Sequence, residues 1–249
     1  METKNKLFAG CELLAPSGNM ECLETAFKFG ADAAYVGGPQ LQLRAQSASF
    51  NEETLARAVE YAHSLGKKLY VTVNCFAKNS EIDILPDYAK FLNDVKVDAA
   101  IVSDLGAIKT IKDNVPDLPV HVSTQANCTN YMSARVYHDM GAERLVLARE
   151  LTLDEIVELR AKTPQSLELE AFVHGAMCMS YSGRCLISSY LTGRSGNRGE
   201  CTQPCRWRYH LVEQTRPNEF FPIEEGIHPY LVDIVLRISE YKIIPLKKI

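Results

Sequence analysis

The sequence lacks the segments and motifs that define several common classes of protein. None of its apolar runs approaches the roughly 20 residues that a membrane-spanning helix needs. Its first residues, METKNKLFAGCELLAPSG, contain no apolar core followed by a small-residue cleavage site, so we expect a cytoplasmic location without a secretory signal. G-x-S-x-G and H-E-x-x-H are absent, and no G-x-G-x-x-G follows the first predicted strand. Their absence argues against a serine-hydrolase elbow, a zinc-protease helix and a dinucleotide fold.

Charge and composition narrow the class further. The 249 residues are 46% hydrophobic and 23% charged, which is typical of a folded globular chain and is enough for one domain of barrel size. The formal net charge of −4 argues against a surface that binds nucleic acid everywhere, although a local basic patch remains compatible with it.

The eight cysteines divide into a scattered set and a clustered set. Without a secretory signal we expect reduced thiols that serve as core residues, metal ligands or reactive groups. Cys11, Cys22, Cys75 and Cys128 are scattered through predicted strands and helices. The other four lie in one window of 28 residues, where even spacing would place about one: Cys178, Cys185, Cys201 and Cys205.

Short β-branched and apolar runs alternate with segments of helical spacing. The expected strands are 12–18, 33–38, 69–76, 99–104, 120–127, 144–150 and 167–175. The expected helices are 20–30, 51–66, 87–95, 131–141 and 151–162, with Asn51 or Ser49 as a cap of the second and glycines after three of them at Gly30, Gly66 and Gly141. This alternation predicts an α/β fold, a TIM-like (β/α) barrel with seven clear strands and no identifiable eighth. The doubly wound sheet is the alternative.

A cysteine-, glycine- and arginine-rich segment follows the seventh predicted strand. Residues 176–216 show no clear period, and we treat them as an insertion in a barrel domain spanning 1–225, followed by an atypical tail at 226–249. The cysteine spacing is Cys178-x6-Cys185-x15-Cys201-x3-Cys205. Long, uneven spacers favour a 4Fe-4S cluster over zinc, whose ligands come in close pairs. A zinc site, a reactive dithiol and simple core cysteines remain alternatives.

The same segment is locally basic in an acidic chain. Six arginines and two acidic residues lie between 184 and 216, interleaved with aromatic side chains. This combination suits phosphate contacts and stacking on unpaired bases, while solvated charges and core aromatics are the alternative explanation. The residues that we expect to contact RNA here are Tyr181, Arg184, Arg198, Arg206 and Trp207.

Polar residues at the predicted strand ends would line the mouth of the barrel, where such folds carry their chemistry. His174, Gln125 and Glu150 are the candidates for catalytic roles, and Arg44 and Asn74 for substrate binding. None of these residues is specific taken alone, since turn and strand-end residues are commonly structural.

The stretch EAFVHGAMCMSYSGRCLIS resembles the signature of the collagenase-like peptidases of unknown catalytic type, the U-thirty-two peptidase family. ELLAPSGNMECLETAFKFGADAAYVGG, STQAN, LARELTLDEI and GNRGECTQPCRWRY are similar to the branch of that family that hydroxylates transfer RNA. The likeness covers about residues 10–225.

The resemblance implies a barrel-like catalytic domain and oxygen-independent formation of 5-hydroxyuridine at the wobble position of tRNA. It implies a 4Fe-4S cluster on the cysteines that match Cys178, Cys185, Cys201 and Cys205, with prephenate as the oxygen donor. Other branches hydroxylate a ribosomal RNA cytidine or a quinone precursor, and some members are reported as collagenases.

The final residues depart from the family pattern. GIHPYLVDIVLRISEYKIIPLKKI matches none of the continuation seen in family members, so we expect a chain truncated near Glu225. The leading hypothesis is a tRNA hydroxylase that receives the anticodon loop on the arginine-rich segment. A peptidase acting on collagen-like or other peptides is the second, and a binding module without turnover is the third. No membrane partner is expected.

Overall fold

The computed structural model describes residues 10–42, 50–175, 178–207, 210–213 and 216–222. The predicted substrate residue Arg44 and the tail at 226–249 lie outside these residues. The strands are β1 (Leu14–Pro16), β2 (Ala33–Gly37), β3 (Lys68–Val73), β4 (Ala99–Val102), β5 (Val120–Val122), β6 (Arg144–Val146), β7 (Glu168–Glu170), β8 (His210–Glu213) and β9 (Arg216–Pro222). The α-helices are α1 (Met20–Lys28), α2 (Glu52–Ser64), α3 (Asn79–Asp94), α4 (Leu105–Asn114), α5 (Tyr131–Asp139), α6 (Leu153–Ala161) and α7 (Ile187–Thr192).

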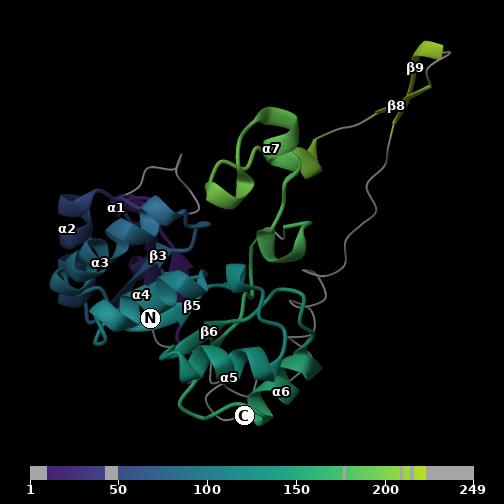
Figure 1. The fold of residues 1–249 in the computed structure, drawn as a ribbon. Helices are drawn as coiled ribbons and strands as arrows, with labels where there is room; N and C mark the ends of the chain where they lie inside the picture. The colour runs from purple at the N-terminus through teal and green to yellow at the C-terminus, as the bar shows by residue number, and fades with distance from the viewer. Residues whose placement is uncertain (1–9, 43–49, 176–177, 208–209, 214–215, 223–249) are drawn as a thin grey trace.

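Strands β1 to β7 form one parallel sheet in which the spatial order is the order of the sequence. Helices connect successive strands and cover one face, and the sheet curls into part of a barrel (Figure 1). A crossover helix after nearly every strand gives this sequential order, because each right-handed connection places the next strand beside the last. The predicted TIM-like α/β fold with seven strands is confirmed. Strands β8 and β9 pair separately as an antiparallel hairpin.

Side-chain caps fix where the helices begin. Asn51 accepts a hydrogen bond from the N–H of Thr54 at 2.8 Å, which confirms it as the predicted cap of α2. Asp104 caps α4 in the same way through the N–H of Ala107 at 2.9 Å. The three predicted glycines follow their helices with positive φ, +103° at Gly30, +65° at Gly66 and +93° at Gly141.

Successive side chains along the strands point to opposite faces of the sheet and form two separate apolar clusters. Val71 and Val73 of β3 join the large cluster between the sheet and its helices, together with Leu55 of α2. The adjacent Tyr70 faces the other way and packs with Ala99 in a smaller cluster on the concave face. The concave face therefore holds little apolar volume and leaves room for polar groups.

A charged network fills the N-terminal end of this concave face. Arg144, the first residue of β6, has a side chain only 9% exposed, and its guanidinium pairs with Glu12 and Glu168 at 2.7 Å each and with Glu170 at 3.4 Å. The hydroxyl of Tyr70 donates to Glu12 at 2.7 Å. Because Glu12 precedes β1 and both other carboxylates belong to β7, Arg144 links the two edges of the open sheet.

The network shifts the titration of its members. Burial acts to raise the pKa of Glu12, but hydrogen bonds from Arg144 and Tyr70 outweigh it and lower that pKa from 4.5 to about 2. Burial lowers the pKa of His121 to about 3, so the ring packed edge-on against Tyr70 at 4.7 Å is neutral at pH 7. Ionised Glu12 thus contributes stability above pH 4.5 that is lost as the pH falls toward 2.

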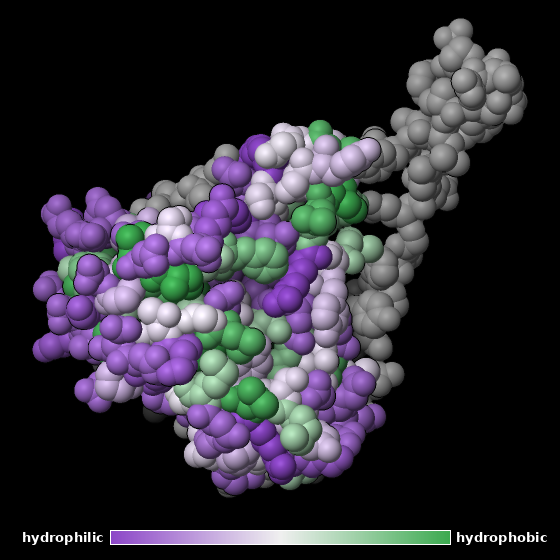
Figure 2. Space-filling view, viewed as in Figure 1, coloured by the Kyte–Doolittle hydropathy of each residue, from purple (hydrophilic) through white to green (hydrophobic). Residues whose placement is uncertain are grey.

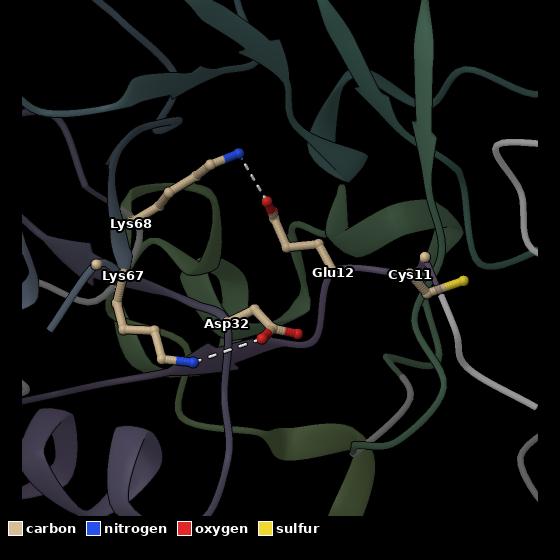
Figure 3. Close-up of a pocket in the computed structure, with 7 residues that line it drawn as sticks. Cys11, Glu12, Asp32, Lys67 and Lys68 are labelled. Carbon is tan, nitrogen blue, oxygen red and sulfur yellow. Dashed lines mark hydrogen bonds and ion pairs between the residues drawn. The ribbon is translucent and has the colours of Figure 1, made fainter. Parts of the chain in front are cut away.

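A shallow depression lies at the same N-terminal ends of the strands, with a volume of about 350 Å³ (Figure 3). Its lysines are paired within it, Lys67 with Asp32 at 3.4 Å and Lys68 with Glu12 at 3.0 Å. Their partners neutralise these charges, so the depression offers no unpaired lysine to a ligand. It lies at the opposite ends of the strands from the cysteine-rich segment.

The observed elements differ from the predicted ones mainly in length. β6 ends at Val146 and β7 at Glu170, so Glu150 and His174 lie in loops rather than at strand ends. Leu147 and Ala148 are buried without belonging to a strand, which is why an apolar run overstated the strand. No helix among the described residues is both long and apolar enough to span a membrane.

We expect Glu12→Gln to lower the free energy of unfolding by about 2 kcal/mol at pH 7, because it leaves the buried Arg144 without one of its charge partners. The loss should shrink as the pH falls from 4.5 toward 2, where wild-type Glu12 becomes protonated. Urea unfolding at several pH values measures both effects. Glu158→Gln, which removes an exposed partner of Lys162, is the control, and an equal small effect in the two variants would contradict the proposed importance of the network.

Candidate functional site

The cysteine-rich segment, residues 178–207, docks on the loops at the C-terminal ends of the strands. It consists of short elements: η3 (Tyr181–Gly183), α7, η4 (Gly196–Arg198) and η5 (Pro204–Arg206). Four contacts with loops after β3, β5 and β6 hold it, and each uses hydrogen bonds or ion pairs. The face expected to carry the chemistry of a (β/α) barrel is therefore the face that this segment covers.

Glu150 forms the contact with the loop after β6. Its carboxylate accepts from the N–H of Ser182 at 2.6 Å and from the Ser182 hydroxyl at 2.7 Å. Ser182 is completely buried and has φ of 40°, a left-handed conformation that a serine rarely adopts. Charge-assisted hydrogen bonds to both polar groups of this residue stabilise the unusual turn. The predicted catalytic residue Glu150 thus has its carboxylate engaged in holding the segment.

Gln125 and the loop after β5 form the second contact. The carbonyl of Gln125 accepts from Nε of Arg184 at 3.3 Å. Gly183 has φ of +87°, and a Cβ there would stand 2.7 Å from Oε1 of Gln125. The positive φ favours glycine at this position, and any larger residue would also push the Gln125 side chain aside. The structure therefore brings Gln125 and Arg184, predicted separately from the sequence, into contact.

Tyr181 and Asn127 form a third, reciprocal contact. Nδ2 of Asn127 donates to the carbonyl of Tyr181 at 3.0 Å, and the Tyr181 hydroxyl donates to the carbonyl of Asn127 at 3.3 Å. Asn127 is itself left-handed, with φ of 58°, a conformation that asparagine tolerates. The ring of Tyr181 remains about half exposed, so the hydroxyl is anchored while the aromatic face is accessible.

Arg198 makes the fourth contact, with the loop after β3 and the first turn of α3. Its guanidinium forms a two-pronged ion pair with Glu81 at 2.5 and 3.0 Å and donates to the carbonyl of Phe76 at 2.6 Å. The hydrogen bond from Arg198 lowers the pKa of Glu81. The guanidinium of Arg184 lies over the ring of Phe76 at 5.5 Å. Arg198, predicted to bind RNA, therefore anchors the segment to the barrel.

Two of the four clustered cysteines already accept hydrogen bonds at sulfur. The N–H of Ile187 donates to Sγ of Cys185, and the N–H of Gln203 donates to Sγ of Cys201, both at 3.4 Å. Backbone N–H groups directed at cysteine sulfur stabilise the thiolate that a metal requires. All four clustered thiols are free, with Cys178 and Cys185 partly exposed.

The clustered thiols do not converge. Among the residues that the structure describes, no group of three or more histidine, cysteine, aspartate or glutamate side chains could hold a metal ion. The predicted cluster on these cysteines therefore stays a prediction. Of the scattered set, Cys75 and Cys128 are core residues, and burial raises the pKa of Cys75 to about 11, which makes it a poor nucleophile.

Asn74 lies at the mouth of the barrel, directly after β3. Its Nδ2 donates to the Ser123 hydroxyl at 3.3 Å, and its carbonyl accepts from the Ser103 hydroxyl at 3.0 Å. Its Oδ1 is buried and has no hydrogen-bond partner among the described residues. A buried acceptor of this kind is costly unless a ligand or water satisfies it, so Asn74 retains binding capacity.

The remaining predicted residues are exposed. His174 lies in the loop after β7, and Arg206 and Trp207 lie near the end of the segment. The indole N–H of Trp207 donates to the carbonyl of Thr202 at 3.2 Å, while 44% of the residue is exposed. No described hydrogen bond joins His174 or Trp207 to Asn74.

Several residues of the site were not predicted. Ser182, Asn197 and Glu81 each hold the segment through hydrogen bonds. Ser182 and Asn197 lie in the stretches that carry the family resemblance, but neither those stretches nor any periodicity assigns a role to these side chains. Ser182 and Asn197 lie among small polar residues, a composition that predicts a loop. The glycine spacing is a further signal, but it marks turns without identifying the side chains that stabilise them.

The fold and the site together define a class: a parallel (β/α) barrel-like protein with a cysteine-rich segment docked over the C-terminal ends of its strands. The sequence model described as Peptidase family U32 matches residues 18–235, and the chain belongs to that family.

The relatives give the family context. The chain is 45% identical over 204 residues to tRNA hydroxylation protein P of Haemophilus influenzae, covering 82% of this chain and 44% of that protein. It is 35% identical over 213 residues to a collagenase of Porphyromonas gingivalis, covering 82% and 51%. The chain thus spans about half the length of the curated relatives it matches. The solved structure of the U32 peptidase Mk0906 shares the fold, with a TM-score of 0.55, 17% identity and coverage of 64% of this chain and 67% of that one.

We expect Glu150→Ala to speed hydrogen exchange of the Ser182 amide by at least about tenfold, because the lost bonds to a charged acceptor are worth roughly 1.5–3 kcal/mol. Glu150→Gln keeps one acceptor oxygen, so its Ser182 amide should exchange faster than in the wild type and more slowly than in Glu150→Ala. Exchange measured by mass spectrometry on peptides covering 178–186 reports the change, with the exposed Glu53→Ala as control. Unchanged exchange in Glu150→Ala would show that this contact does not hold the segment.

Proposed function

We propose that this chain is the barrel portion of a tRNA hydroxylase, which binds a 4Fe-4S cluster and forms 5-hydroxyuridine at the wobble position without molecular oxygen. Prephenate is the proposed oxygen donor. Family membership and the 45% identity to a tRNA hydroxylation protein support the RNA-hydroxylating role. The observation that carries the proposal is the pair of backbone N–H groups directed at Cys185 and Cys201 in a segment docked over the strand ends.

The donor set fits a cluster in chemical type. Cys178, Cys185, Cys201 and Cys205 supply four thiols, as the four irons of a cubane require, and the long spacers suit separated corners. The two N–H donors to sulfur match the hydrogen bonds that tune such clusters. When bound, a 4Fe-4S cluster supplies one-electron transfer.

The outer surface of the segment supports binding of single-stranded RNA. Tyr190 is 88% exposed, and Tyr181 and Trp207 each expose nearly half of their surface. Hydrophobic side chains also reach the surface in the upper part of the molecule, where α7 lies (Figures 1 and 2). Aromatic faces stack on bases of any sequence, and the exposed guanidinium of Arg184 can contact phosphate or stack beside them. Anchoring of the Tyr181 hydroxyl lowers the entropic cost of presenting its ring.

The mouth of the barrel is the proposed place for the reacting nucleotide and the co-substrate. Asn74 offers a side-chain amide oxygen, Oδ1, that has no hydrogen-bond partner among the described residues, and Gln125 lies against Gly183 at the same rim. His174 is exposed and serves as the proposed proton carrier. Glu150 contributes by holding Ser182 and hence the position of the segment.

Protein purified without oxygen should contain about four iron and four acid-labile sulfide atoms per chain, with a broad visible absorption band. A variant with Cys178→Ala and Cys201→Ala should lose both, whereas Cys22→Ala, an exposed cysteine outside the cluster, should keep them. Zinc, or no metal in a folded protein, would overturn the cluster assignment.

Tyr190→Ala should weaken binding of an anticodon stem-loop by about fivefold or more, through the loss of base stacking. Arg184→Ala should weaken it and reduce the salt dependence of log Kd against log salt by about one unit. Fluorescence anisotropy at several salt concentrations measures both, with Lys90→Ala, which changes an exposed side chain of α3, as control. If all three variants bind the stem-loop as tightly as the wild type, this surface is not the RNA-binding site.

The hydroxylase itself is tested with the cluster-loaded chain, undermodified tRNA and prephenate under argon. Nucleoside mass spectrometry should reveal 5-hydroxyuridine that depends on prephenate and on the four cysteines. In cells, deletion of the encoding gene should remove nucleosides derived from 5-hydroxyuridine. An unchanged nucleoside profile in the deletion strain would contradict the proposed hydroxylase activity.

Peptide hydrolysis is the second candidate, favoured by the 35% identity to a collagenase. A cysteine peptidase needs a thiol paired with a histidine, and no described hydrogen bond joins His174 to a cysteine. Cleavage of denatured collagen by highly purified chain, abolished by Cys178→Ala or His174→Ala, would support this activity. Cleavage that survives both substitutions would point to a contaminant.

A further inference from the structure

Two buried polar side chains cross-link the turns that carry Cys185 and Cys201. Oδ1 of Asn197 accepts from the N–H of Cys185 at 3.1 Å, and Nδ2 of Asn197 donates to the carbonyl of Cys185 at 2.9 Å. The hydroxyl of Ser188 in turn accepts from the N–H of Thr202, the residue after Cys201, at 3.1 Å.

The arrangement is reciprocal. Asn197 precedes Cys201 by four residues and holds Cys185, whereas Ser188 follows Cys185 by three residues and holds the peptide after Cys201. Each cysteine turn is thus fixed by a side chain from the other turn. Asn197 is 7% exposed and Ser188 1%, so both bonds are shielded from water, where they are worth most.

The clamp also connects to the barrel. The carbonyl of Asn197 accepts from the N–H of Phe76 at 3.2 Å, and the adjacent Arg198 forms the ion pair with Glu81. The two sulfurs that accept backbone N–H groups are therefore held relative to each other and to the loop after β3.

We propose that Asn197 and Ser188 are positioning residues that set the spacing of the Cys185 and Cys201 thiolates for a tetrathiolate metal centre. The role of this centre in catalysis rests on the function proposed above, but the clamp itself does not. Positioning groups behind metal ligands typically contribute 10- to 100-fold in metal affinity. Neither residue touches the metal or substrate in this proposal.

The test uses the full chain, reduced and free of metal, titrated with Co²⁺ while sulfur-to-cobalt absorption is recorded. Asn197→Ala and Ser188→Ala should each bind Co²⁺ at least about tenfold more weakly than wild type. Asn197→Asp keeps the acceptor for the Cys185 N–H and should recover part of the affinity. Phe29→Ala, which removes a 79% exposed ring at the end of α1, should bind cobalt like wild type.

The outcomes separate this proposal from the hydroxylase. Wild-type affinity in both Asn197→Ala and Ser188→Ala, or wild-type protein without thiolate-bound cobalt, would overturn the clamp. Weakened cobalt binding in both variants would support it even if anaerobic protein lacks iron and sulfide, a result that would defeat only the proposed function. If Asn197→Ala loses its fold by circular dichroism, Ser188→Ala and Asn197→Asp decide the question.

Discussion

Arg144 is the cation on which the shape of this molecule depends. Strands β1 to β7 form an open parallel sheet, and the carboxylates that surround Arg144 come from its two edges, Glu12 before β1 and Glu168 and Glu170 in β7. A buried guanidinium is tolerated only when carboxylates compensate it, so the first and last parts of the barrel are required to meet around it. The concave face is consequently polar at its N-terminal end, where small residues such as Ala33 leave room.

The opposite end of the strands is organised by hydrogen bonds rather than by apolar packing. Glu150, Gln125 and Asn127 extend from loops after β5 and β6 and hold the polar atoms of the segment that follows β7. Little buried apolar surface supports this segment, and its aromatic side chains point to solvent. The cysteines and aromatic rings of this segment are not packed in the hydrophobic core, so they are accessible as metal ligands and as stacking faces. Stability and candidate function therefore occupy opposite ends of the same strands.

The two ends were predictable to different degrees. The alternation of apolar and β-branched runs with helical segments predicted all seven strands, because each strand contributes apolar side chains to the core between the sheet and its helices. Asn51 and the three helix-ending glycines were also predicted, because caps act through local geometry. The docking contacts were not, since Ser182 and Glu150 are 32 residues apart and their pairing depends on the curvature of the sheet. Arg198 shows the same limit: as one of six arginines it indicated RNA, yet its guanidinium pairs with Glu81, 117 residues away.

The sequence by itself determined the class of fold, the clustering of four cysteines and the family, because each follows from local periodicity, spacing or a contiguous signature. The tertiary structure decided which polar residues act together. It placed Glu150 beneath Ser182, Asn197 beside Cys185 and Arg144 among three carboxylates. Hydrogen bonds and ion pairs are short-ranged and directional, so partners distant in sequence meet only once the strands fix the loops. That is the physical reason why composition indicated a metal-binding, basic segment while only the folded chain revealed what holds it.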